Sequence, residues 1–241
     1  MLSSKIVIFS FPRAGTKLLA DILQQQGYHN FGELFETFGT EIDNLDPPTA
    51  KRLTLEKQHK IFESTNSPSL VNEDLHSHSL LISNRVELYK KYRNIMPSTI
   101  TVFLNNIEIY PELLSILGDR YFLCLRRRNL LDQIISRVIT QIHKNYNGEI
   151  ESTKIVIDTW RIDKFFFNIK KLERIQDFIV SEGKGQIVDF DKLITSTENL
   201  GFKYSVTSID QHPNLWDLVI NLDEVKSRFE YLEKLYQCTN S

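Results

Sequence analysis

Residues Ile6–Lys17, with the sequence IVIFSFPRAGTK, decide the fold of this chain. Ile6–Ser10 is a short run of β-branched and aromatic side chains that ends in a serine, and it predicts a strand buried on both faces. Phe11–Gly15 interrupts this run, and apolar residues then recur at helical spacing from Leu18 to Leu23. A strand, a tight loop and a helix in this order predict the opening unit of a nucleotide-type α/β fold.

Strands and helices continue to alternate along the chain. Apolar runs predict further strands at Thr99–Leu104, Tyr121–Leu125 and Gln186–Phe190. Helical periodicity predicts helices at Leu80–Tyr92, Ile107–Leu117, Asn129–His143 and Lys154–Ser181, with one or two more within Leu215–Gln237. This alternation implies a parallel sheet with right-handed crossovers. We therefore expect a three-layer α/β/α fold in a single domain over residues 1–241, with the polar segment 37–72 as an insertion or lid.

The composition excludes several classes of protein. The 29 Lys and Arg residues nearly balance the 31 Asp and Glu residues of the 241-residue chain, which argues against a nucleic-acid binder that relies on bulk positive charge. Cys124 and Cys238 are too few for a disulfide framework. No apolar run approaches the roughly 18 residues of a membrane span, and no signal peptide is recognisable. We expect a soluble, cytoplasmic protein without an integral membrane segment.

The loop after the first strand has the properties of an anion site. Backbone N–H groups at a helix N-terminus attract phosphate, and the helix dipole adds to this attraction. Gly15 permits a close backbone approach, Arg13 and Lys17 supply positive charge, and Thr16 supplies a hydroxyl group. A plain strand-to-helix turn with a surface Arg and Lys is the alternative interpretation of this loop.

The loop lacks the Walker pattern of kinases and GTPases. That pattern requires a Gly, four further residues, and then Gly-Lys-Ser/Thr. When Lys17 is aligned with the Walker Lys, Ser10 takes the place of the first Gly and Leu18 that of the Ser or Thr. Because a leucine cannot ligate magnesium, this difference weakens the interpretation as a kinase or GTPase, and a small nucleotide kinase or other phosphotransferase is kept as the alternative enzyme class.

A second basic motif follows the third predicted strand. The run Arg126–Arg128 falls at the carboxyl end of that strand, on the edge where parallel sheets bind ligands. Guanidinium groups suit phosphate oxygens, and Ser136, two helical turns later, offers a further hydroxyl group. A solvated basic turn with a serine on the helix surface is the alternative.

Together, the two motifs resemble those of sulfotransferases. Pro12–Lys17 resembles the 5′-phosphosulfate loop Pro-Lys/Arg-Ser-Gly-Thr-Thr, with Ala14 in place of Ser and Lys17 in place of Thr. Arg128–Ser136 resembles the 3′-phosphate motif Arg-Asp/Asn-Pro-x-Asp-x-x-x-Ser, with Leu130 in place of Pro and the Arg-to-Ser spacing kept. Ile187–Leu193 is more weakly similar to the family's strand that ends in Tyr-Glu-Asp-Leu. The motifs occur in family order.

The resemblance implies a sulfuryl donor and a set of residues that bind it. The donor would be 3′-phosphoadenosine 5′-phosphosulfate (PAPS), and the product 3′-phosphoadenosine 5′-phosphate (PAP). Arg13 would contact the bridging oxygen and the sulfonate, and the loop amides of Ala14, Gly15 and Thr16 would hold the 5′-phosphate together with Lys17. Arg128 and Ser136 would bind the 3′-phosphate. No metal is required, and the acceptor would be the hydroxyl of a small molecule, a glycan, a lipid headgroup or a peptide tyrosine.

The general base is expected to be a glutamate. Small-molecule sulfotransferases carry a catalytic His after the next strand, but Phe103–Asn106 offers none. Gly32-Glu33 resembles the Gly-Glu segment of the carbohydrate and tyrosylprotein enzymes, which carries their base. We therefore expect Glu33 to be the base, with Glu36 in reserve, against the alternative of a solvated surface carboxylate. A catalytically inactive nucleotide-binding module is a further alternative for the protein as a whole.

Overall fold

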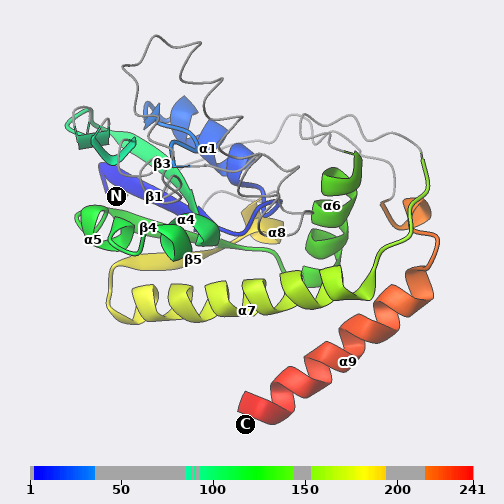
Figure 1. Ribbon diagram of the computed structural model, residues 1–241. Helices are drawn as coiled ribbons and strands as arrows, with labels where there is room; N and C mark the ends of the chain where they lie inside the picture. Colours follow the sequence, from blue (N-terminus) through cyan, green and yellow to red (C-terminus); the bar gives the residue numbers. More distant parts are fainter. Residues whose placement is uncertain are drawn as a thin grey trace, which may run out of the picture.

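A five-stranded, all-parallel sheet forms the centre of the protein (Figure 1). This computed structural model describes residues 3–35, 85–87, 89–90, 93–143, 153–193 and 215–240. The strands are β1 (Lys5–Ser10), β2 (His29–Asn30), β3 (Ser98–Phe103), β4 (Tyr121–Arg126) and β5 (Gly185–Asp189). They lie in the order β2-β3-β1-β4-β5. The expected parallel sheet is therefore confirmed, whereas the expected lid at 37–72 and Glu36 lie outside the described residues.

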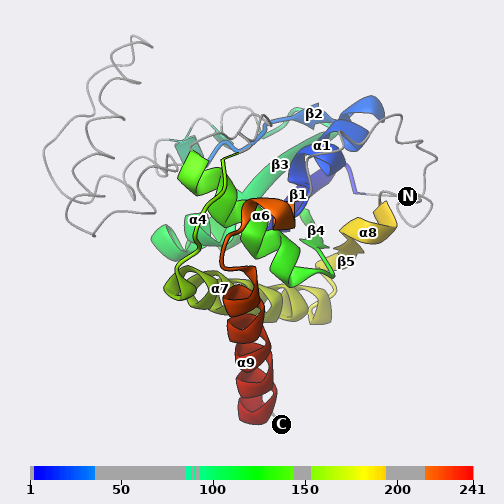
Figure 2. The same ribbon diagram turned by 90° about the vertical axis from the view of Figure 1, so that its right-hand side faces the viewer.

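Helices cover both faces of this sheet, as the expected three-layer fold requires. They are α1 (Thr16–Gln25), α4 (Leu104–Ile109), α5 (Leu113–Ile116), α6 (Leu130–His143), α7 (Thr159–Ser181), α8 (Phe190–Leu193) and α9 (Leu222–Asn240), with a 3₁₀ helix at Leu215–Leu218. Figure 1 shows α1 on one face and α7 along the other, and Figure 2 shows α6 standing near the ends of β1 and β4. The long helix α9 packs on α7 and extends away from the sheet.

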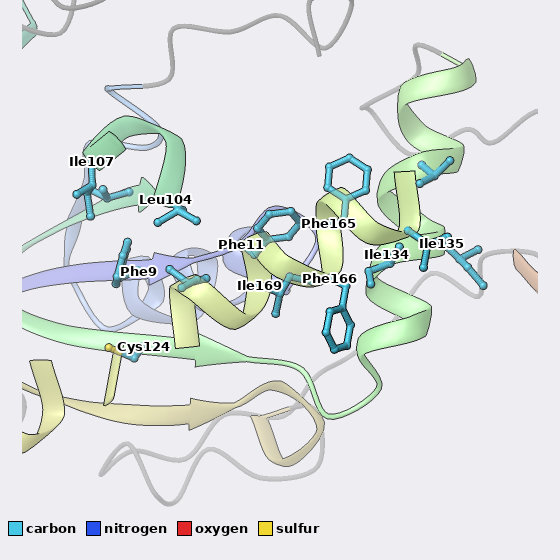
Figure 3. Packing of buried hydrophobic residues seen from close by; sticks show 14 of the residues in the cluster. Phe9, Phe11, Leu104, Ile107, Cys124, Ile134, Ile135, Phe165, Phe166 and Ile169 are labelled. Atoms are coloured by element: carbon cyan, nitrogen blue, oxygen red, sulfur yellow. The ribbon is translucent and has the colours of Figure 1, made fainter. Parts of the chain in front are cut away.

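Side chains of β1 alternate between two apolar layers. Val7 and Phe9 belong to the core under α7, while Ile6 and Ile8 belong to the smaller core under α1. All four are fully buried, because a parallel strand with helices on both faces has no solvent side. Figure 3 shows Phe165 and Ile169 of α7 in the larger core, near Ile134 of α6.

The structure corrects several of the predicted element boundaries. The single helix predicted at Ile107–Leu117 is wrong, because the chain leaves the helix at Tyr110-Pro111 and forms α4 and α5 instead. Proline has no N–H to donate and clashes with the preceding turn. The strand predicted to end at Leu104 ends at Phe103, and the helix predicted from Lys154 starts at Thr159. The two-residue strand β2 had no apolar run to reveal it.

In open parallel sheets, ligands bind in the crevice outside the carboxyl ends of the strands, at the point where the strand order reverses. The crossover after β1 leads to β2 at one edge of the sheet, whereas the connection after β4 leads to β5 at the other edge. A topological switch point therefore lies between the carboxyl ends of β1 and β4. The two motifs that the sequence singles out follow these two strands, so the fold places both beside the same crevice.

Candidate active site

The loop Phe11–Gly15 adopts an unusual backbone conformation at the carboxyl end of β1. Arg13 has φ 67° and Gly15 has φ 92°, both in the left-handed region. An Arg rarely adopts this region, and strained residues of this kind concentrate at functional sites. The neighbouring ring of Phe11 is buried and packs edge-on against Phe165 of α7, with centroids 5.8 Å apart. The core thus anchors the loop while Arg13 remains partly exposed.

Gly15 makes room for an aromatic ring. A Cβ atom at this position would lie 2.1 Å from Cε2 of Phe190, the first residue of α8. No side chain larger than hydrogen fits there without a shift of the ring. Phe190 also meets the guanidinium group of Arg127, whose Cζ lies 5.4 Å from the ring centroid. Phe190 thus contacts both of the loops that carry the predicted anion-binding residues.

Two hydrogen bonds join the loop after β1 to helix α6. Nε of Arg13 donates to Oγ of Ser136 at 3.2 Å, and Nε2 of Gln133 donates to the carbonyl of Pro12, also at 3.2 Å. Gln133 and Ser136 are both buried, although they carry polar side chains. Arg13 and Ser136 therefore lie side by side, although more than a hundred residues separate them in the sequence.

The remaining loop residues lie around the N-terminus of α1. Ala14 is fully buried in the smaller core, so an apolar side chain suits this position. Thr16 is buried in the first turn of α1, and Lys17 is exposed beside it. The first N–H groups of a helix have no partner within it and remain available to an anion. Ala14–Lys17 therefore provide backbone donors and one exposed cation.

The three consecutive arginines after β4 have different surroundings. Arg126 donates to Gln176, Asp177 and the carbonyl of Glu173, all on α7. The hydrogen bonds of Arg126 hold β4 against α7. Arg127 instead packs on the ring of Phe190. Arg128 is the most exposed of the three, with 66% of its side chain accessible. It is therefore the arginine best placed to meet a ligand from solvent.

Gln176 holds together the two strand ends that flank the crevice, a role that was not predicted from the sequence. It is fully buried on α7, and its Nε2 lies within hydrogen-bond distance of the carbonyls of Phe9 (2.9 Å) and Leu125 (3.4 Å). Its Oε1 accepts the hydrogen bond from Arg126 at 2.7 Å. One amide group therefore ties the carboxyl ends of β1 and β4 together. The signal in the sequence is a glutamine on the otherwise apolar face of α7.

The segment that carries Glu33 is held along the edge of β3. The N–H of Phe31 donates to the carbonyl of Thr99, and the N–H of Thr101 donates to the carbonyl of Gly32. Two residues beyond Glu33, the carbonyl of Phe35 accepts a hydrogen bond from Asn106 Nδ2 at 3.0 Å. These contacts fix the backbone on both sides of Glu33. Asn106, buried at the start of α4, is a second positioning residue that the sequence did not single out.

The Glu33 carboxyl group has a perturbed pKa. Its side chain reaches solvent, but the surrounding protein removes enough water to raise the pKa above its ordinary value near 4.5. The positive charge of Arg137 opposes this effect. Arg137 follows Ser136 on α6, so Glu33 faces the helix that Arg13 also contacts. The Glu33 carboxylate therefore interacts electrostatically with the turn of α6 that also carries Ser136. Arg137 is a further site residue that was not predicted.

Within the described residues, no group of three or more His, Cys, Asp and Glu side chains is arranged to hold a metal ion. In the same part of the chain, no helix has the length and apolar character to cross a membrane. Cys124 lies in the core, and burial raises the pKa of its thiol to about 12.

No known family model matches the chain, and no curated protein matches it.

Proposed function

We propose that this protein is a sulfotransferase that moves a sulfuryl group from PAPS to the hydroxyl of a small-molecule or glycan acceptor. The observation that carries the proposal is the hydrogen bond between Arg13 and Ser136. Each residue belongs to one of the two motifs that resemble the donor site of sulfotransferases. A shared binding site requires the motifs to meet at one place, and this contact at the switch point of the sheet supports such a site.

The charges around the crevice suit a nucleotide with two separate phosphate positions. In the proposal, the N–H groups at the start of α1 and the cation of Lys17 hold the 5′-phosphate. Arg128, exposed after β4, and the hydroxyl of Ser136 bind the 3′-phosphate. Arg13 lies at the contact between the loop after β1 and helix α6, and in the proposal it reaches the oxygen that bridges phosphorus and sulfur. This assignment places a cation or a hydroxyl at each end of the donor.

The transfer step needs a base and a cation. Glu33 accepts the proton of the acceptor hydroxyl while the acceptor oxygen forms its bond to sulfur. The bond between sulfur and the bridging oxygen breaks, and its electron pair stays on that oxygen, where Arg13 neutralises the developing charge. The products are a sulfate ester and PAP, and Glu33 then releases its proton to water. Leu18, at the place of a Walker magnesium ligand, supports sulfuryl rather than phosphoryl transfer.

Transfer of radioactive sulfate tests the proposal. The protein is incubated with [³⁵S]PAPS and a panel of phenols, oligosaccharides and tyrosine peptides in the presence of EDTA. We expect a labelled product with at least one acceptor, and a turnover at least about 100-fold lower for Glu33→Gln. Asp21→Asn removes an exposed carboxylate from α1 and serves as the control. Equal turnover for Glu33→Gln would exclude Glu33 as the base, and PAP binding without transfer to any acceptor would favour the inactive module.

A further inference from the structure

The corner between β5 and α8 holds the loop that carries Arg128. Oδ2 of Asp189 accepts a hydrogen bond from Nε of Arg128 at 2.6 Å, and Oδ2 of Asp191 accepts one from the backbone N–H of Arg128 at 3.1 Å. Asp189 is the last residue of β5 and lies opposite Arg126 in the register of the sheet. Two carboxylates on one corner therefore fix both the backbone and the side chain of the same arginine.

Asp189 is itself held rigidly. Its Oδ1 accepts the N–H groups of Asp191 at 3.0 Å and Lys192 at 3.4 Å, which caps the short helix α8. Its side chain is only 20% accessible, whereas that of Arg128 is 66% accessible. Desolvation of the Asp189 carboxyl group is outweighed by these hydrogen bonds and by the charge of Arg128, so its pKa lies below the ordinary value. The anchor is therefore an ionised, fixed carboxylate, and the arginine is the exposed partner.

The contact leaves the outer fork of the guanidinium group available. Asp189 takes the Nε–H, so the hydrogen atoms on Nη1 and Nη2 form the pair that can meet two phosphate oxygens. An exposed Arg without this contact would sample many rotamers, and binding would have to restrict them. The carboxylate also repels a phosphate, so its charge and its grip on Arg128 act in opposite directions on nucleotide affinity.

We propose that Asp189 is the positioning residue for the 3′-phosphate, which it serves by holding the Nε of Arg128 so that the Nη groups face the ligand. The proposal rests on the proposed function, because it assigns a 3′-phosphate to Arg128. Asp189 thereby increases the preference of the site for a 3′,5′-bisphosphate over a 5′-monophosphate. Orientation of the fork outweighs the repulsion between the Asp189 carboxylate and the ligand.

Calorimetric titration with PAP and with adenosine 5′-monophosphate tests this role. Asp189→Ser keeps a side-chain oxygen that can cap α8, but the serine is too short to reach Arg128. We expect this variant to lose about three- to tenfold of the preference for PAP, the range that corresponds to restricting one long side chain on binding. Asp177→Asn is the matched control, since it removes one carboxylate from the neighbouring Arg126 and leaves Asp189 in place. The control should keep the wild-type preference.

The double variant Arg128→Ala/Asp189→Ser shows whether Asp189 acts through Arg128. If it does, Asp189→Ser causes no further loss of the preference once Arg128 is absent, because only the repulsion between the carboxylate and the phosphate is then removed. An unchanged or increased preference in Asp189→Ser would overturn the proposal, as would an equal loss in the Arg128→Ala background. Failure of the proposed function would give a different result, because the wild-type protein itself would then bind the two nucleotides equally.

Discussion

Nε of Arg13 donates a hydrogen bond to the hydroxyl of Ser136 at 3.2 Å, and this contact links the carboxyl ends of β1 and β4 through α6. Ser136 is buried, so water competes little for its hydroxyl group. The geometry makes Ser136 common to both parts of the proposed donor site: it touches the cation of the first loop and follows Arg128 in the second motif.

Ser136→Ala should weaken PAP binding about tenfold and leave adenosine 5′-monophosphate affinity nearly unchanged, because it removes one hydrogen bond to the 3′-phosphate. Calorimetry with both nucleotides measures the effect. Ser181→Ala, at the far end of α7, removes a hydroxyl that donates to the carbonyl of Phe178 and serves as the control. An equal loss for both nucleotides would place Ser136 outside the 3′-phosphate site.

The activity should fall at acidic pH as Glu33 becomes protonated. Because partial burial raises the pKa of Glu33, the acidic limb of kcat/KM should lie above pH 4.5. Arg137→Met removes the charge that lowers this pKa, so the limb should shift to higher pH. Arg174→Met, which removes a cation from α7, should leave the limb in place. A limb in Arg137→Met that stays fixed or shifts to lower pH would contradict the assignment of Glu33.

Gly15→Ala should destabilise the fold by about 2–4 kcal/mol. Part of this cost comes from the left-handed backbone, and the rest from overlap between the new Cβ and the ring of Phe190. Gly27→Ala is a close control, because Gly27 has φ 87° but no atom of the described residues lies within 4 Å of the added Cβ, so we expect a cost of only about 1 kcal/mol. Urea denaturation measures both values. Equal costs for the two variants would show that Phe190 does not restrict Gly15.

Arg120→Met should reduce the free energy of unfolding by about 3 kcal/mol or more. Arg120 is buried at the amino edge of the sheet, where it donates to the hydroxyl of Tyr89, the carbonyl of Ile6, and the carbonyl and hydroxyl of Ser98. The substitution leaves these buried acceptors without their donor.

Lys5→Met is the control for this change, since it breaks the partly exposed ion pair with Asp119 and should cost at most about 1 kcal/mol. Because Arg120 lies at the edge opposite the crevice, the folded fraction of Arg120→Met should bind PAP with wild-type affinity. A stability like that of Lys5→Met, or a selective loss of PAP binding, would contradict this structural role.

Much of the fold could be predicted because its signals are local. The apolar residues of β1 follow one another directly, and those of α6 recur on successive helical turns. The pattern of apolar residues alone therefore reveals both elements. Local patterns also misled at one point, where a continuous apolar pattern from Ile107 to Leu117 concealed the break at Pro111. The short strand β2 has its place because Phe31 and Gly32 bond to β3, which no local pattern indicates.

The candidate site likewise has residues that could be predicted from local motifs and supporting residues that could not. Arg13, Arg128 and Ser136 fall in motifs whose spacing is visible in the sequence. Their supporting partners come from distant segments: Asp189 holds Arg128 from 61 positions away, and Asn106 holds the carbonyl of Phe35 from 71. Contacts of this kind depend on the order of the strands in the folded sheet, so no local sequence pattern reveals them.

The most direct test of the central claim is a calorimetric comparison of PAP and ATP on the wild-type protein, with EDTA and then with magnesium. The proposed site requires a 3′-phosphate and assigns no residue to magnesium. We therefore expect PAP to bind in EDTA at least about tenfold more tightly than ATP, a difference of about 1.4 kcal/mol, with little change on adding magnesium. Tighter binding of ATP in the presence of magnesium would contradict the claim and favour a nucleotide phosphotransferase.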